Sequence, residues 1–297
     1  MGESGKTALS AALLTVAALI WGSSFVVVKD TLNSVQPFTL CALRFMPSAV
    51  LLALAYAGKL RRVKPAEIKN GCIIGVFLFL CYLADILAFR YTTASKMAFI
   101  TGLNVVFVPF LAWKFNGRRP DGWAIAGVAL AALGLGLLTI QKGETVNIGD
   151  VIALAAAVLM AAHMIAIEHF GKNSDPVALT VMQFGVTGAG FVVLALAFDS
   201  IGDSSGLGTL AGSLPQISYL VVFCTLLTLL IQNVAQKRLS STSTAVILML
   251  TTVFGSISSI YFLHEYMSAQ MAAGGILIII AIVTQEAKWS FLKRRSD

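Results

Sequence analysis

Long apolar stretches, separated by short polar ones, follow one another along the whole chain. Each is roughly 17 to 22 residues long, which is the length at which an α-helix spans a lipid bilayer. We therefore expect ten membrane-spanning helices, with cores at residues 9–28, 38–57, 71–89, 97–115, 123–140, 151–167, 177–198, 217–235, 245–263 and 268–285. This pattern predicts an all-α integral membrane protein.

The second half of the chain repeats part of the first. Residues 98–130 align without a gap with residues 245–277 and share nine identical positions. Farther upstream the matching residues are 139 positions apart, whereas these later pairs are 147 apart. Since five is an odd number, two halves of five helices cross the membrane in opposite directions, as in the inverted repeats of many transporters. We expect a five-helix unit at 1–146 and an inverted one at 147–297.

The composition excludes a soluble globule. Hydrophobic residues make up 58% of the 297 residues and charged residues 12%, and the mean hydropathy is +0.86. The net charge of +7 does not predict a nucleic-acid partner, because 16 of the 21 Lys and Arg residues fall at the amino end, in the even-numbered loops and in the tail. Basic loops face the cytoplasm. We therefore expect both termini there, with the helices in the lipid bilayer of the cell membrane.

The sequence predicts no metal or cofactor. Its four cysteines, Cys41, Cys72, Cys81 and Cys224, lie inside apolar stretches and form no C-x-x-C pair, so neither a zinc site nor a disulfide framework is indicated. The phosphate-binding pattern G-x-x-x-x-G-K-[ST] is also absent from the sequence. Any ATP-driven transport would need a second protein.

Residues 21–25 (WGSSF), Arg44-Phe45 in the second span and residues 117–120 (GRRP) after the fourth form a set of short motifs. In this order along ten spans they resemble the drug/metabolite transporter superfamily, and within it the EamA-type family. The chain departs from the family at Arg118, where a Glu is frequent, although the second half keeps an acid at Glu265. The resemblance implies a basket of helices around a cavity lined by spans 1–4 and 6–9. It also implies transport of a small organic solute, often the export of amino acids or related metabolites.

Two ionisable residues interrupt the apolar stretches near their outer ends. At 1.5 Å per residue, Arg44 lies about 9 Å below the end of span 2 and Asp85 about 6 Å below the end of span 3. A charge inside a bilayer is costly, so each requires a partner or a watery cavity. We expect gating or coupling, with Asp85 as a proton-coupling acid and Arg44 as the ligand of a substrate carboxylate. The alternative is a structural ion pair between neighbouring helices.

Other polar or adaptable side chains inside the spans are candidates for the substrate site. Some share a helix face, such as Thr225, Thr228 and Gln232, which are three and four residues apart on span 8. The alternative for each is a hydrogen bond or a packing contact between helices. The residues that we predict to bind the substrate are Trp21, Asn104, Met160, His163, Gln183, Thr228 and Gln232.

These features favour a secondary transporter of a small organic metabolite, an amino acid or a related compound, with export as the expected direction. A channel is the runner-up, although no ring of like charges is visible. An intramembrane enzyme would need a nucleophile and a base, such as Ser23 and His163, but no recognisable sequence motif surrounds either residue. The inverted repeat argues against a receptor role, because such repeats are typical of transporters. We therefore expect no enzyme activity, and a monomer or a homodimer.

Overall fold

The computed structural model describes residues 3–92, 94–117, 119–120, 122–139, 147–199, 211–263, 269–270, 272–277 and 280–281. All regular structure in these residues is helical. Arg118, Glu265 and the basic tail lie outside them, and the expected tenth span is described only in part, at 269–270, 272–277 and 280–281. The helices are α1 (Glu3–Thr31), α2 (Pro37–Ala55), α3 (Ala57–Leu60), α4 (Pro65–Ala88), α5 (Ala94–Thr101), α6 (Asn104–Asn116), α7 (Gly122–Thr139), α8 (Ile148–Phe170), α9 (Pro176–Phe198), α11 (Leu214–Tyr219), the π-helix η1 (Leu220–Leu227), α12 (Thr228–Ala235), α13 (Ser241–Leu248) and α14 (Leu250–Leu263).

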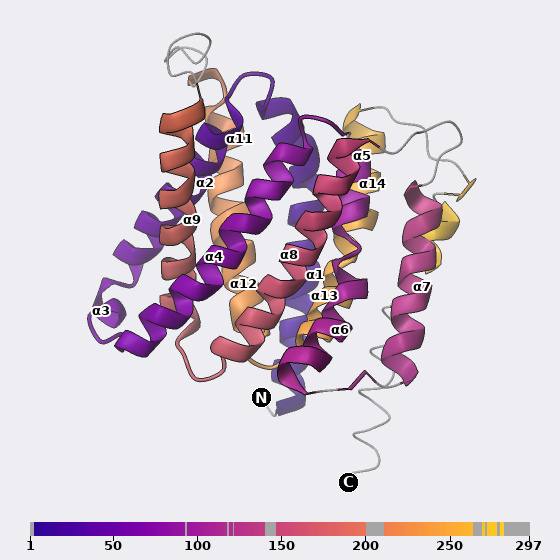
Figure 1. The fold of residues 1–297 in the computed structure, drawn as a ribbon, viewed down its shortest axis with the longest axis horizontal. Coiled ribbons are helices and arrows are strands. Elements are labelled where there is room, and N and C mark those ends of the chain that lie inside the picture. The colour runs from indigo at the N-terminus through magenta and orange to yellow at the C-terminus, as the bar shows by residue number, and fades with distance from the viewer. Residues whose placement is uncertain are drawn as a thin grey trace.

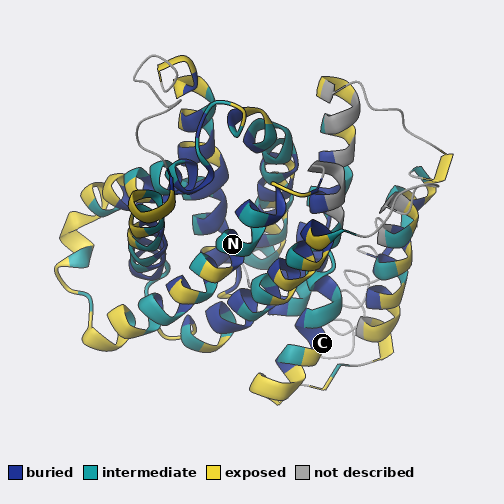
Figure 2. Cartoon of the chain, turned by 45° about the horizontal axis from the view of Figure 1, so that its top comes forward, coloured by how far each residue is buried: buried dark blue, intermediate teal, exposed yellow. Residues whose placement is uncertain are grey.

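The helices have the length and the surface of membrane-spanning elements. Six are long and apolar enough to cross a bilayer, namely α1, α2, α4, α8, α9 and the continuous helical stretch Leu214–Ala235. Exposed positions lie along the outer faces of the helices (Figure 2), and many of them are large apolar residues: the exposed fraction is 71% at Leu54, 68% at Leu196 and 71% at Phe198. Water would oppose so much exposed apolar surface, whereas lipid accepts it. The all-α, membrane-embedded fold expected from the sequence is confirmed.

Three of the expected spans are not continuous α-helices. Span 4 is divided into α5 and α6 by a turn at residues 102–103, and span 9 into α13 and α14 at Met249. Span 8 stays helical, but residues 220–227 form a π-helix between α11 and α12. At the first turn Gly102 lowers helix stability because glycine loses the most backbone freedom on folding. At this turn, hydrogen bonds of the 3₁₀ type replace the i→i−4 bonds of an α-helix. One of them runs from the N–H of Leu103 to the carbonyl of Ile100, at 3.0 Å.

The two halves of the chain are interlocked. α2 packs along α9, α4 packs along α8 and α9, and α1 packs along α12 and α14 (Figure 1). The contact between α1 and α14 is close because of Gly22: a Cβ atom there would lie 2.6 Å from Cβ of Phe254 and 2.8 Å from the backbone nitrogen of Gly255. α7 lies at the edge of the bundle, against α5 and α6.

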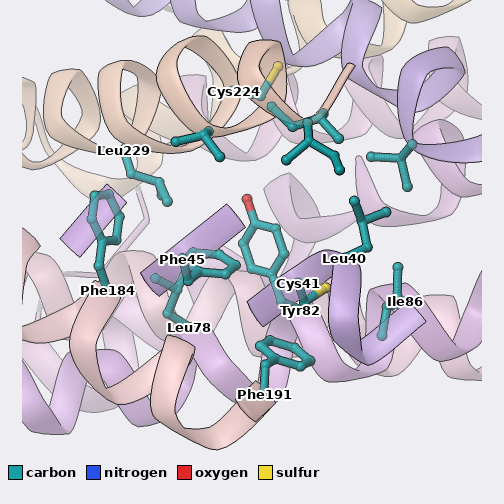
Figure 3. Close-up of a cluster of buried hydrophobic side chains, with 14 of the residues drawn as sticks. Leu40, Cys41, Phe45, Leu78, Tyr82, Ile86, Phe184, Phe191, Cys224 and Leu229 are labelled. Atoms are coloured by element: carbon teal, nitrogen blue, oxygen red, sulfur yellow. The ribbon is translucent and has the colours of Figure 1, made fainter. Parts of the chain in front are cut away.

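An aromatic cluster holds α2, α4 and α9 together (Figure 3). The ring of Phe45 on α2 lies 4.8 Å from that of Tyr82 on α4, and 6.0 and 6.2 Å from those of Phe184 and Phe191 on α9, centroid to centroid. The first two pairs are edge-to-face and the third is stacked, and aromatic pairs contribute stability beyond the area that the rings bury. The cluster fixes the position of Tyr82, which lies one turn before Asp85 on α4.

Carboxylates fasten helix ends at both ends of the bundle. Asp199, after α9, accepts hydrogen bonds from the backbone N–H and the hydroxyl of Thr39, at 2.6 and 2.8 Å. Glu67, at the start of α4, accepts the N–H of Asp175 at 2.8 Å, just before α9. The unsatisfied N–H groups of a helix start favour such acceptors. α9 is thus tied to α2 at one end and to α4 at the other.

Candidate functional site

A cavity of about 110 Å³ lies among α1, α2, α4, α8 and the two divided spans. It is small, with room for a compact solute of a few heavy atoms rather than for a drug-sized molecule. Its wall is mostly apolar with a few polar groups. The residues that line it include Trp21, Arg44, Tyr82, Asp85, Thr101, Gly102, Asn104, Met160, Leu248, Met249, Thr251 and Thr252.

Arg44 is buried in this wall, with 5% of its surface exposed. Its Nε donates a hydrogen bond to Oγ1 of Thr225 at 3.3 Å. Its guanidinium carbon lies 5.3 Å from the ring centroid of Tyr82 and 6.0 Å from that of Phe45. The aromatic faces stabilise the cation without using its N–H groups. Arg44 is therefore held in place while its terminal nitrogens stay available to an anion.

Asp85 lies on the same wall, on α4. Its Oδ1 is buried and has no hydrogen-bond partner among the described residues. No salt bridge between Asp85 and Arg44 is found in the part of the chain that the structure describes, so the two residues share a cavity without a direct ion pair. A buried carboxylate oxygen without a partner is costly. The geometry thus favours a ligand or a proton at Asp85 over the structural ion pair that the sequence also allowed.

Three other predicted residues, Trp21, Asn104 and Met160, also line the cavity. Trp21 has a second contact, because its Nε1–H donates to the carbonyl of Cys224 at 2.8 Å. In the same π-helix the carbonyl of Val221 accepts the hydroxyl of Ser48 at 3.1 Å. Side chains of α1 and α2 thus bind carbonyls of η1. These contacts hold η1 against α1 and α2, where Oγ1 of Thr225 accepts the hydrogen bond from Arg44.

Four predicted residues, His163, Gln183, Thr228 and Gln232, are buried between helices and are not among the residues that line the cavity. His163 Nε2 lies 3.1 Å from Oε1 of Gln183, and Gln183 Nε2 donates to Oδ1 of Asn233 at 3.1 Å. This chain of side chains joins α8, α9 and α12. Thr228 donates to the carbonyl of Cys224 and Gln232 to Oε1 of Gln236.

The geometry does not assemble the dyad that an intramembrane enzyme would need. The hydroxyl of Ser23 lies 2.6 Å from that of Tyr219 and donates to the carbonyl of Ile20 at 2.7 Å. His163 pairs with Gln183 instead. A serine nucleophile requires a base within hydrogen-bond reach. Ser23 and His163 therefore do not form the pair.

Two further wall residues, Tyr82 and Thr251, were not among the residues predicted to bind the substrate. Tyr82 precedes Asp85 by three positions, which places both on one helix face. Thr251 aligns with Asn104 in the internal repeat, at the offset of 147. Its Oγ1 is buried and unpartnered among the described residues. The internal repeat thus pairs Thr251 with the predicted residue Asn104 on the cavity wall.

Comparison with known proteins gives a consistent result. The model of the EamA-like transporter family matches the chain twice, at residues 8–140 and 147–284. A protein of Archaeoglobus fulgidus named "Uncharacterized transporter" is 31% identical over 291 residues, which cover 95% of this chain and 87% of that protein. A Bacillus subtilis protein, "Uncharacterized transporter YvbV", is 21% identical over 94% of this chain and 92% of its own length. A solved crystal structure aligns over 97% of this chain and 99% of its own, with a TM-score of 0.76 and 17% identity, and so shares the fold.

Proposed function

The chain belongs to the EamA-like transporter family, and on that basis we propose that it is a secondary transporter that moves a small organic metabolite by alternating access. The observation that carries the proposal is the cavity inside the bundle, which holds Arg44 and Asp85 without a direct ion pair between them. Charged groups inside a bilayer usually mark a transport path. Because elements of both halves build the wall, a motion of one half against the other would change access to it.

The transport unit in this proposal has ten spans in two inverted halves, 1–146 and 147–297. Two observations support it: the family model matches the chain twice, and spans 4 and 9 are divided at positions that the internal repeat aligns. The connections between α2 and α4, between α8 and α9, and between α12 and α13 lie at the same end of the bundle as the N-terminus (Figure 1). They carry basic residues such as Arg62, Lys172 and Lys237. This end then faces the cytoplasm of a cell-membrane protein.

The solute in this proposal is a compact zwitterion, such as an amino acid or a related compound, which the protein exports. The guanidinium of Arg44 binds its carboxylate, because two parallel N–H groups match two carboxylate oxygens. Asp85 accepts its ammonium group or carries the coupled proton. Trp21, Asn104 and Met160 complete the wall. Four predicted residues act through helix packing, because their side chains form hydrogen bonds with neighbouring helices or within their own helix: His163, Gln183, Thr228 and Gln232.

Counterflow in proteoliposomes tests the proposal. Purified protein is reconstituted, the vesicles are preloaded with one unlabelled amino acid at a time, and uptake of the same labelled amino acid is followed. A carrier exchanges solute and accelerates the labelled uptake above the unloaded control, whereas an open channel does not. Absence of stimulation across the twenty common amino acids would reject the proposed solute class. Labelled uptake that is equal in preloaded and unloaded vesicles would favour a channel.

A further inference from the structure

The two divided spans are interrupted at equivalent positions. α5 gives way to α6 at residues 102–103, and α13 gives way to α14 at Met249. Gly102 and Met249 are 147 positions apart, which is the offset of the internal repeat. Both halves of the chain therefore carry the same interruption.

The interruptions lie side by side at one level of the bundle. α5 packs against α14 and α6 against α13, as two antiparallel spans that are divided at the same depth must do. The hydroxyl of Thr252 bridges them, donating to the carbonyl of Ala98 at 3.1 Å. Residues next to both interruptions line the cavity: Thr101, Gly102, Asn104, Leu248, Met249, Thr251 and Thr252.

Asn104 and Thr251 occupy aligned positions, and both line the cavity. Oγ1 of Thr251 is buried and has no hydrogen-bond partner among the described residues. Polar groups in such positions are normally satisfied by protein, water or ligand. The hydroxyl of Thr244, in α13, is also buried without a partner in the described part of the chain, but Thr244 is not a lining residue.

We propose that Asn104 and Thr251 form a subsite for a neutral hydrogen-bonding group of the solute, a hydroxyl or an amide. The proposal rests on the proposed transport of a zwitterion. Arg44 and Asp85, on α2 and α4, take the charged groups, and the two interruptions take the neutral one. The preferred solutes are then zwitterions that carry a polar, uncharged side group. A site built to satisfy such a group discriminates against analogues that lack it, because its own polar atoms are left unpaired.

Two pairs of nearly isosteric probes test the subsite. L-threonine and L-valine differ by a hydroxyl in place of a methyl group, and L-asparagine and L-leucine by an amide in place of a branched alkyl group. The wild-type protein is expected to bind the polar member of at least one pair about tenfold more tightly, the effect of one hydrogen bond. Thr251→Val or Asn104→Leu abolishes that preference. Thr251→Ser and the matched control Thr244→Val keep it.

If the wild-type protein binds both members of each pair equally, the proposed subsite is wrong. It is also wrong if the preference for the polar member survives in both Thr251→Val and Asn104→Leu. If none of the four probes binds, the zwitterion class fails, and cysteine labelling then decides on the subsite alone. In a cysteine-free background, Asn104→Cys and Thr251→Cys are expected to react with methanethiosulfonate ethylammonium at least about tenfold faster than Thr244→Cys, because labelling requires access from water. Rates no faster than that of Thr244→Cys contradict the subsite.

Discussion

Arg44 is held by a hydroxyl and two aromatic rings rather than by a carboxylate. This arrangement fixes the cation but does not neutralise it. In the proposed mechanism, a solute carboxylate arrives and leaves without displacing a strong protein partner. Thr225 positions Arg44 in this mechanism, because it accepts the hydrogen bond from Nε and not from the terminal nitrogens that would bind the solute.

We therefore predict that Thr225→Val raises KM for transport about fivefold at unchanged kcat, since the lost hydrogen bond contributes about 1 kcal/mol. Thr225→Ser restores KM, because serine retains the hydroxyl. Initial rates of counterflow over a range of solute concentrations measure both constants. A fall in kcat alone would indicate that Thr225 acts in the conformational change and not in positioning Arg44.

Asp85 provides a second prediction at this scale. Its buried, unpartnered Oδ1 suits a carboxyl group that binds and releases a proton during transport. Asp85→Asn is expected to abolish uphill transport driven by a pH gradient and to keep solute exchange, because the amide retains the shape but cannot ionise. A mutant whose pH-driven uptake equals that of the wild type would remove Asp85 from the coupling mechanism.

Depth in an apolar span could be predicted from the sequence, but the direction of a side chain could not. Arg44 and Asp85 were identified because a charge in a span needs water or a partner. His163 and Gln183 are also polar residues inside spans, yet they bond to each other between α8 and α9. Helical spacing says which residues share a face and not which neighbour that face meets.

At the scale of elements, hydropathy predicted the positions of the helices but not their internal irregularities. The divisions at 102–103 and Met249 and the π-helix at 220–227 lie within uniformly apolar stretches. They depend on which backbone groups find partners elsewhere, as Cys224 does through the indole N–H of Trp21. Such contacts join residues about 200 positions apart and leave no local pattern. π-helical segments often accompany functional sites.

The hydrogen-bonded chain of His163, Gln183 and Asn233 is expected to stabilise the bundle without touching the solute. Gln183→Leu should lower the free energy of unfolding by about 1–3 kcal/mol, because His163 and Asn233 each lose a partner in a buried place. Unfolding in detergent micelles measures the change, with Val193→Ala on the exposed face of the same helix as the control. A raised KM at unchanged stability would instead place Gln183 in contact with the solute.

The close contact of α1 with α14 makes a sharper stability prediction. Gly22→Ala would place a methyl group 2.6 Å from Phe254 Cβ, and the resulting overpacking should destabilise the protein by about 1–3 kcal/mol. Gly58→Ala is the matched control, because no atom lies within 4 Å of the added carbon there. Equal melting temperatures for the two variants would contradict the tight α1–α14 contact.

For the whole molecule, the family expected from Trp21–Phe25, Arg44-Phe45 and the GRRP stretch is confirmed, and so are a helical membrane fold and a transporter class. These properties could be predicted because they follow from composition, span length and the order of short motifs. The solute could not, because a handful of wall residues selects it. The interlocking of the halves, α2 along α9 and α4 along α8, also needed the structure.

Alternating access is tested most directly by distances between spin labels at the two ends of the bundle. One pair, Tyr91→Cys and Phe198→Cys, reports on the end where α4 and α9 finish; the other, Arg62→Cys and Lys237→Cys, reports on the opposite end. Double electron–electron resonance on reconstituted protein is expected to give two distances for each pair, and the solute that supports counterflow should lengthen one pair while it shortens the other. A single distance in each pair that the solute leaves unchanged, or a simultaneous lengthening of both, would contradict the mechanism.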